Sequence, residues 1–362
     1  MRSWVEVSRS RIRENYRAIR AIVRGAAEVM PVVKADAYRH GAVEVSRVLE
    51  AEGVRWLAVS NVEEGVYLRK SGINTRILVM ADFLPEERDT LTELRLTPVV
   101  HTLEDLPAVR VPYHLKIDSG MGRLGTRAVP DEVVRRVAET TAPLEGLMTH
   151  FASAGNYEST QTHDQIEHFE GVLAALRTAK MAPEYVHLSS TIPVAYRRQE
   201  AWGNLVRIGY AIYGYVSPAR GPVPTATLGV RPALTWKATI LAVKDLEAGA
   251  LVGYGGMHRA AKPIRIAVLA AGYADGIPHR LSNRGKVIAK GQLVPIIGAV
   301  SMDLTTIDIT SCPDLRVGDS VMLLGEEGQV SIDAQQMART AGTISYSVLC
   351  GISARVKRVY VD

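Results

Sequence analysis

The stretch Pro31-Val32-Val33-Lys34-Ala35-Asp36-Ala37-Tyr38-Arg39-His40-Gly41 carries the most direct information about fold and chemistry in this sequence. It begins as a short apolar run of the kind that predicts a buried strand, with Lys34 at the carboxyl end of that strand. A lysine in this place is costly to desolvate, so it is usually paired, or neutral and used chemically. A lysine with a lowered pKa is the residue type that forms a Schiff base with an aldehyde cofactor. The alternative is a lysine whose stem lies along the apolar surface and whose amine reaches solvent.

The composition is that of an ordinary globular protein with room for two domains. The chain has 362 residues, 47% apolar and 22% charged. Its net charge of +5 comes from basic residues scattered among acidic ones, so no nucleic-acid partner is expected. The two cysteines, Cys312 and Cys350, exclude a disulfide framework, and no residue is assigned to a metal. The N-terminus lacks an apolar signal region and no run of about 18 apolar residues occurs. We therefore expect a cytoplasmic protein without a membrane partner.

Strands and helices alternate over the first part of the chain, a pattern typical of parallel strands with crossover helices. After the strand that ends at Lys34, further strands are predicted at residues 56–59, 77–80, 97–100, 114–118, 144–148, 185–188 and 205–208. Helices are predicted between them, and an initial helix covers residues 9–24. About eight such units in about 230 residues predict a (β/α)8 TIM-type barrel over residues 8–230.

The pattern changes near Pro232 to short β runs separated by glycine turns. Residues 231–362 are therefore predicted to form a mainly β domain, in which only residues 331–340 have a helical pattern. We expect the N-terminal strand, within residues 1–7, to join this domain.

Several polar residues follow predicted strands of the barrel. Because the chemistry of such barrels lies at the carboxyl ends of the strands, these residues are expected to cluster. They are the glycine-rich segment from Lys116 to Arg123, then His150, Ser189 to Thr191, and Arg207. Each has a plainer interpretation: Lys116 as a salt-bridged lysine, His150 as a structural histidine, Arg207 as an ion pair at the barrel rim. The glycine-rich loop is compatible with a carboxylate clamp or a phosphate loop.

The opening stretch resembles the pyridoxal-phosphate lysine motif of the alanine racemases, V-V-K-A-[ND]-A-Y-G-H-G, in which Arg39 replaces a glycine. The resemblance extends over nearly the whole chain. In this motif Lys34 carries the cofactor and Tyr38 belongs to the cofactor site. The resemblance implies pyridoxal 5'-phosphate as the cofactor.

Further barrel residues acquire roles from this resemblance. The segment from His114 to Gly125 resembles H-L-K-[VI]-D-[ST]-G-M-G-R-x-G, in which Arg123 orients the substrate carboxylate. Lys116 corresponds to a lysine that is often N-carboxylated. His150 resembles the histidine that contacts the catalytic tyrosine. The resemblance also implies that Ser190 or Thr191, together with Gly209 and Tyr210, binds the cofactor phosphate. Arg207 would face the pyridine nitrogen and keep it unprotonated by charge repulsion.

The β domain carries the remaining motif residues. Val252-Gly253-Tyr254-Gly255 resembles V-S-Y-G, whose tyrosine is the second acid/base, although the local pattern alone predicts that Tyr254 is a half-buried strand residue. The resemblance places Tyr273, Met302 and Asp303 at the substrate and Tyr346 at the cofactor phosphate. In this family the sites are shared across a homodimer, so Tyr254 would act in the partner's site.

The resemblance implies a racemase that interconverts L-alanine and D-alanine by a two-base mechanism with Lys34 and Tyr254, supplying D-alanine for peptidoglycan. The alternatives are a racemase of serine, lysine or several amino acids on the same scaffold, and a non-catalytic pyridoxal-phosphate-binding protein. A decarboxylase of the same fold is disfavoured because neither cysteine lies in a suitable context.

Overall fold

The computed structural model describes residues 1–81, 83–225 and 228–362 and divides them into two compact units. The barrel unit comprises residues 11–37 and 42–231, and the β unit comprises residues 1–10, 38–41 and 232–362. No helix within the described ranges is long and apolar enough to cross a membrane.

In its described residues, the barrel unit is built on eight parallel strands. They are β2 (Glu28–Pro31), β3 (Trp56–Val59), β4 (Arg76–Val79), β5 (Leu96–Val100), β6 (Tyr113–Lys116), β7 (Leu144–Met148), β8 (Tyr185–His187) and β9 (Leu205–Ile208). Strands β3 to β8 form one continuous sheet in sequence order, and β2 pairs with β9. The two sheets meet where Val32 bridges Ala58 and where the Arg207 amide donates to the Ser189 carbonyl at 3.1 Å. The predicted barrel architecture is confirmed.

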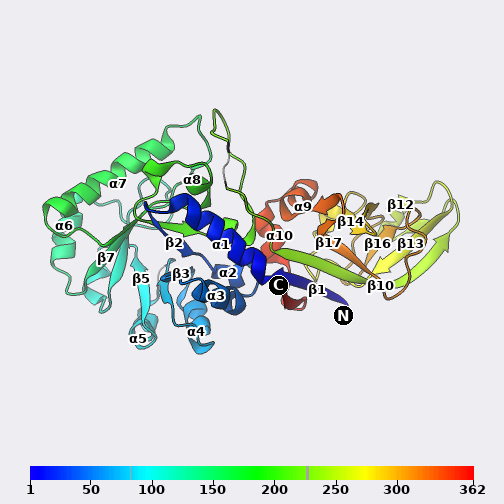
Figure 1. Cartoon of the computed structure of the whole chain (residues 1–362), viewed down its shortest axis with the longest axis horizontal. Coiled ribbons are helices and arrows are strands. Elements are labelled where there is room, and N and C mark those ends of the chain that lie inside the picture. Colours follow the sequence, from blue (N-terminus) through cyan, green and yellow to red (C-terminus); the bar gives the residue numbers. More distant parts are fainter. Residues whose placement is uncertain (82, 226–227) are drawn as a thin grey trace. The chain divides into compact units, whose positions relative to one another are not determined.

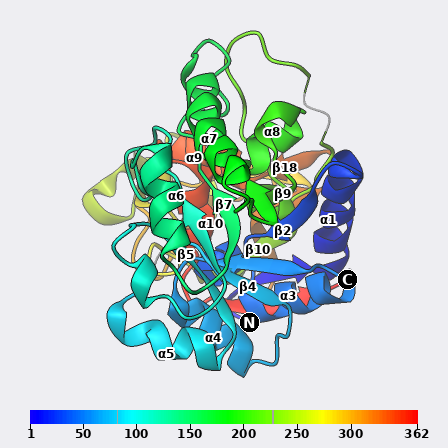
Figure 2. The same ribbon diagram turned by 90° about the vertical axis from the view of Figure 1, so that its left-hand side faces the viewer.

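Helices cover the outside of these strands, as Figures 1 and 2 show for α6 and α7 beside β5 and β7. The longer helices are α1 (Arg9–Val23), α3 (Ala42–Ala51), α4 (Val62–Lys70), α6 (Pro130–Ala138) and α7 (Gln161–Thr178), with the short α5 (Arg88–Glu93) and α8 (Thr191–Ala195). Strands β3, β5, β6, β8 and β9 are buried along their whole length. This burial explains their near-continuous apolar sequences.

The β unit contains a sheet in the order β15 (Gln292–Pro295), β14 (Lys286–Ala289), β17 (Ser320–Glu327), β10 (Leu234–Leu246), β1 (Ser3–Ser8) and β19 (Lys357–Val361). Strand β1 runs parallel to β19 and antiparallel to β10. Strand β13 (Ile264–Leu269) joins β10 to β16 (Thr305–Asp308), while β18 (Val330–Ile332) pairs with β17. A two-stranded ribbon is made by β11 (Leu251–Val252) and β12 (His258–Arg259).

The β unit holds one more helix than the sequence pattern predicts. Helix α9 (Ala334–Ala341) lies where a helix is expected, and its N-cap Asp333 and Gln336 form a capping box. Helix α10 (Ser345–Gly351), with buried Val348 and Leu349, was not predicted. A helix this short, with only two buried positions, has too little periodicity to be detected.

Candidate functional site

The lysine stretch leaves the barrel wall and enters a left-handed turn. Strand β2 ends at Pro31, earlier than the sequence predicts, but its pairing continues up to Lys34, because Val32 bridges Ala58 and the Val33 amide donates to the Ala58 carbonyl at 2.8 Å. Backbone φ is positive at Ala35 (52°), Asp36 (53°), Ala37 (53°), Tyr38 (52°) and Arg39 (66°). Such a conformation costs an L-residue roughly 1–2 kcal/mol each. Consecutive strained residues of this kind occur where the surrounding structure imposes them, often at functional sites.

Two carboxylates hold the turn. One oxygen of Glu64 accepts the Ala35 amide at 2.6 Å, and the other accepts the Ser60 amide at 2.7 Å. Asp36 accepts the Ala42 amide at 2.8 Å. Within the turn, the Ala37 amide donates to the Val33 carbonyl at 2.9 Å. These bonds fix the backbone on both sides of Lys34.

Arg207 lies inside the barrel and not at its rim. Its side chain is buried, and one terminal nitrogen donates to His187 Nδ1 at 3.0 Å and to the His187 carbonyl at 2.7 Å. The other donates to the carbonyls of Thr149 at 2.7 Å and Leu188 at 3.0 Å, and lies 3.2 Å from His150 Nδ1. Burial lowers the pKa of the guanidinium to about 9, which leaves it charged at neutral pH. An ion pair at the barrel rim is therefore the wrong interpretation.

Cationic side chains gather around Arg207. Burial, and then the charges of Arg207 and Arg123, lower the pKa of Lys116 to about 8. Burial and the charges of Arg207, Lys116, Arg123 and Lys34 lower the pKa of His150 to about 3. Within the described residues no carboxylate lies in ion-pair distance of Lys116, so the plain salt-bridge interpretation is wrong. The barrel unit thus brings together Lys34, Lys116, Arg123, His150 and Arg207.

The glycine-rich loop is shaped by Asp118, a residue that sequence reasoning did not single out. Its carboxylate accepts the amides of Gly120, Met121 and Gly122 at 3.2, 2.9 and 2.9 Å. Its other oxygen accepts from Arg127 Nε at 2.7 Å. An aspartate before a glycine-rich segment is a known turn signal. Because Asp118 accepts the hydrogen bonds of these amides, they are not available to a phosphate group. The Arg123 side chain, in the same loop, is exposed.

Small polar groups follow β8 and β9. Thr191 begins α8 and its hydroxyl lies 3.4 Å from the Ala211 amide. Ser190 precedes the helix in an extended conformation, and its hydroxyl makes no cap bond. Gly209 and Tyr210 are buried where the chain leaves β9. Ser189 donates its hydroxyl to the Ala201 carbonyl at 2.7 Å, so that hydroxyl has a structural partner.

In the β unit, several predicted site residues are strongly exposed. Tyr254 is 77% exposed and begins a short turn after β11, so the half-buried strand interpretation is wrong. Met302 and Tyr273 are 54% and 45% exposed, and the Tyr273 amide donates to the Ser301 carbonyl at 2.9 Å. Asp303 pairs with Arg355 at 2.7 Å. The Tyr346 ring, on α10, lies 6.0 Å from that of Tyr38.

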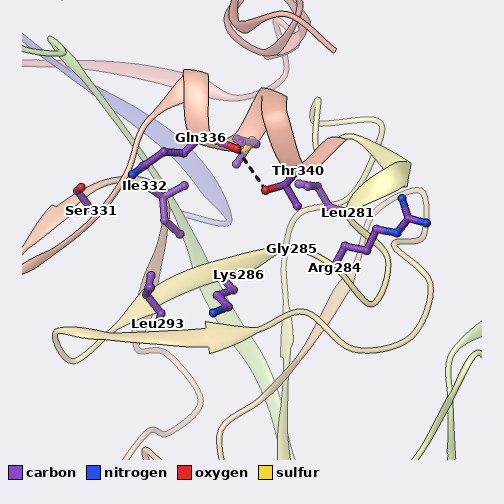
Figure 3. A pocket seen from close by; sticks show the side chains of 10 residues that line it. Leu281, Arg284, Gly285, Lys286, Leu293, Ser331, Ile332, Gln336 and Thr340 are labelled. Carbon is purple, nitrogen blue, oxygen red and sulfur yellow. Dashed lines mark hydrogen bonds between the residues drawn. The ribbon is translucent and has the colours of Figure 1, made fainter. Parts of the chain in front are cut away.

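Two hollows lie in the β unit. The first, of about 290 Å³, lies between α9 and the β14–β15 hairpin; Figure 3 shows Leu281, Leu293 and Ile332 lining it together with Lys286 and Arg284. It contains no predicted site residue. The second, of about 500 Å³, is bordered by Tyr273, His279 and Ser347. In the part of the chain that is described, no group of three or more histidine, cysteine or carboxylate side chains is arranged to hold a metal.

Comparison with known proteins identifies the family. Residues 7–218 match the alanine racemase N-terminal domain, and residues 233–360 match the alanine racemase C-terminal domain. The chain belongs to the alanine racemase family. An alanine racemase of Carboxydothermus hydrogenoformans is 39% identical over 99% of both chains, and one of Halothermothrix orenii is 37% identical over 99% of this chain and 96% of its own length. The alanine racemase structure of Clostridium difficile 630 matches with a TM-score of 0.92, at 33% identity, over 100% of this chain and 96% of that one.

Alanine racemases are pyridoxal-phosphate-dependent isomerases, and this family member is an enzyme of that class. The cationic cluster suits a cofactor and a substrate that both carry negative charge. Lys116, Arg123, Arg207 and Lys34 supply positive charge, whereas the Asp118 carboxylate already has its own partners. A cluster of cations attracts an anionic ligand.

Two further histidines were not identified from the sequence as parts of this site. His187 receives a hydrogen bond from Arg207 and lies 2.8 Å from His114. His114 opens the segment from His114 to Gly125 and His187 ends β8, but only their contacts in the barrel connect them to Arg207.

Proposed function

We propose that this chain interconverts L-alanine and D-alanine, with pyridoxal phosphate bound in the barrel unit. The observation that carries the proposal is Arg207, a buried arginine that two neutral histidines and three carbonyls hold among other cations. Such an arginine repels a proton from a neighbouring pyridine nitrogen. Arg207 would thereby keep the ring a weak electron sink, which would favour return of the proton over side reactions.

The residues of the barrel divide the work of binding and proton transfer. When bound, the cofactor would supply an electron sink that acidifies the substrate Cα–H. Lys34 moves a proton at one face of Cα, and Arg123 orients the substrate carboxylate. We assign the phosphate to Ser190, Thr191, Gly209, Tyr210 and Tyr346, with Tyr38 beside the cofactor.

Lys116 is proposed to carry an N-carboxyl group. A lowered pKa makes the neutral amine available to carbon dioxide; its nitrogen would bond to the carbon and release a proton to water, and the product is a carbamate anion. That anion would offset the charge of Arg123 and Arg207 and hold Arg123 in position.

The opposite face of Cα is assigned to Tyr254 of a second subunit, with Tyr273, Met302 and Asp303 of that subunit near the substrate. Inversion needs a base on each face, because a single base would have to cross the plane of the substrate. The exposure of Tyr254, Met302 and Tyr273 supports a covering partner, since large exposed apolar groups mark interaction surfaces. We further propose that this homodimer works in the cytoplasm, where the thiols of Cys312 and Cys350 stay reduced.

The activity is tested by proton NMR of L-alanine in heavy water with the cofactor-loaded protein, followed by chiral analysis. Loss of the α-proton signal together with formation of D-alanine is the expected result. An intact α-proton signal would reject alanine as the substrate. The same measurement on serine, lysine and arginine then separates another racemase from a protein that only binds the cofactor.

The shared site is tested by mixing two inactive variants, Lys34→Ala and Tyr254→Phe, under conditions that exchange subunits. In a mixed dimer one site carries both changes and the other carries neither. Random exchange should therefore restore about a quarter of the wild-type activity. Sites formed within one subunit would give no recovery.

A further inference from the structure

We infer that a relay of side chains on four neighbouring strands, from the buried Arg207 to the partly buried Glu145, positions the Arg207 guanidinium. Its members are Arg207 on β9, His187 on β8, His114 on β6 and Glu145 on β7. The inference rests on the proposed function for its meaning, because that function assigns Arg207 to the pyridine nitrogen. His187, His114 and Glu145 are positioning residues that act through Arg207.

The contacts form a continuous series. Arg207 lies 3.0 Å from His187 Nδ1, and His187 Nε2 lies 2.8 Å from His114 Nδ1. His114 Nε2 lies 3.8 Å from a carboxylate oxygen of Glu145. The same oxygen accepts from Arg76 at 2.6 Å, at the first residue of β4. The series therefore runs from the carboxyl ends of the strands, where the site lies, toward their amino ends.

The donor-only chemistry of arginine fixes the direction of every hydrogen bond in this series. Arg207 has no acceptor, so His187 Nδ1 must accept from it and must lack a proton. The proton of a neutral His187 is then on Nε2, which donates to His114 Nδ1. By the same logic the proton of His114 is on Nε2, directed at the Glu145 carboxylate. One charged residue thereby sets the tautomers of both rings.

Burial keeps both rings neutral, as this arrangement requires. His114 and His187 are fully buried, and desolvation lowers the pKa of each. Glu145 opposes this effect by raising the pKa of His114, whereas the charges of Arg76 and Arg207 lower it, and the charge of Arg207 also lowers the pKa of His187. In a protonated His187, Nδ1–H would face the N–H of Arg207, and two donors cannot form a hydrogen bond. The 3.0 Å contact and the lowered pKa therefore both indicate a neutral His187.

The barrel makes room for this series. A Cβ at Gly146 would lie 2.4 Å from His114 Nδ1, so the glycine is needed for the ring to reach His187. The His114 ring packs against Tyr185, with centroids 5.9 Å apart, and against Trp56 at 5.3 Å. His114 Nε2 is buried without a partner at ordinary hydrogen-bond distance, and the Glu145 carboxylate, 3.8 Å away, is the acceptor nearest to its proton in this series. Burying two polar imidazole rings costs free energy of desolvation. The orientation that they impose on Arg207 is a functional reason for this cost.

The relay is tested first by NMR of the full-length, cofactor-loaded protein with isotope-labelled histidine. Long-range proton–nitrogen correlation distinguishes the two neutral tautomers and the cation. We expect His187 and His114 to be neutral with the proton on Nε2. A proton on Nδ1, or a charged ring, at either residue would overturn the relay. This result does not depend on turnover: if the tautomers are as expected but alanine keeps its α-proton, the relay stands and the proposed function fails.

The second test compares His114→Asn with His114→Leu, which introduce two side chains of similar size. The asparagine side chain retains an acceptor near the position of Nδ1, whereas the leucine side chain removes it and leaves the His187 proton without a partner. We expect the leucine variant to lose roughly 10- to 100-fold in kcat with little change in KM, because Arg207 is misplaced. The asparagine variant should recover most of that loss, and the absorbance maximum of the bound cofactor should shift only in the leucine variant.

Tyr113→Phe is the matched control, since Tyr113 is the buried neighbour of His114 on β6 and lies outside the series. It should leave kcat and the absorbance maximum unchanged. Equal loss in the asparagine and leucine variants would show that His114 only fills space, which would overturn the inference. If the leucine variant does not fold, the NMR measurement of the histidine tautomers in the wild-type protein still tests the inference.

Discussion

At the scale of single residues, the site depends on which nitrogens carry a proton. Burial and neighbouring cations lower the pKa of Lys116 to about 8, while Arg207, with a pKa of about 9, stays charged at neutral pH. His150 is held neutral, so it can receive the hydrogen bond from Arg207 and still donate through Nε2. The site thus combines Arg207, which stays positively charged, with Lys116, which is partly neutral near pH 8.

The pH dependence of N-carboxylation at Lys116 follows from that lowered pKa. Only the neutral amine reacts with carbon dioxide, so at constant dissolved carbon dioxide the carbamate should increase as pH rises through about 8. An exposed lysine would require a pH above 10 for the same extent of reaction, given its usual pKa of about 10.4. Carbon NMR with labelled carbon dioxide measures the carbamate, and Lys116→Ala should remove the signal. A signal that persists in this variant would place the carbamate elsewhere.

The substitution Lys34→Ala should abolish the visible absorbance of the cofactor when it is attached to the protein. The amine is the group that forms the Schiff base, and alanine cannot replace it. Absorption spectroscopy of the loaded variant measures the effect. Lys70→Ala, on the outer helix α4, is the control and should keep the wild-type spectrum. An unchanged spectrum in the Lys34 variant would show that another lysine holds the cofactor.

At the scale of elements, the left-handed turn after Val33 is the feature that aims the lysine. Its positive φ values cost energy at alanine and arginine, which are poorly suited to them. Arg39 stands where the family motif has glycine, and its Nε donates to the Cys350 carbonyl at 3.3 Å, while its own carbonyl accepts from Arg358 at 3.1 Å. Side-chain and backbone bonds therefore offset the conformational cost in this chain.

Removing the Glu64 carboxylate should loosen this turn. Glu64→Ala leaves the amides of Ala35 and Ser60 without their partner, and we expect the free energy of unfolding to fall by about 2 kcal/mol. Cofactor affinity should fall as well, because the backbone on either side of Lys34 is less fixed. Urea unfolding and cofactor titration measure the two effects.

Glu63→Ala is the matched control for Glu64. Both residues lie in the first turn of α4 and share its helix-dipole environment, but Glu63 is exposed. It should change stability by no more than about 0.5 kcal/mol. Equal effects of the two substitutions would show that the contribution of Glu64 comes from its charge at the helix end.

At the scale of the whole molecule, the barrel unit buries histidines in their neutral form. Burial is the first cause that lowers the pKa of His101 to about 4 and of His150 to about 3, and it also lowers the pKa of His114 and His187. Each of these has its ordinary pKa, about 6.5, in the unfolded chain. Below that pH the unfolded state binds more protons than the folded state.

Acid should therefore destabilise this protein at a pH where an ordinary barrel is stable. The stability contributed by neutral histidines is complete above pH 6.5 and is lost as pH falls toward the folded-state values of about 4 and 3. Urea unfolding at a series of pH values measures the slope. His101→Asn should reduce that slope, whereas His168→Asn, at an exposed position on α7, should not. A slope that is the same in wild type and His101→Asn would contradict the prediction.

The amino-acid sequence by itself determined the barrel, the β domain and the family, because strand periodicity and motif residues are local properties of the chain. It placed Lys34, Lys116, Arg123, His150 and Arg207 after strands, and the barrel brings them together. Helix α10 was not predicted because so short a helix shows almost no periodic pattern of apolar residues.

Only the tertiary structure decided the end of β2, the left-handed turn and the exposure of Tyr254. It also decided that Arg207 is buried and that His187 and His114 continue its hydrogen bonds toward Glu145. The physical reason is that pKa values, tautomers and backbone strain depend on neighbours from distant parts of the chain. Gly146 shows this directly, since its importance lies in the space it leaves for a histidine on another strand.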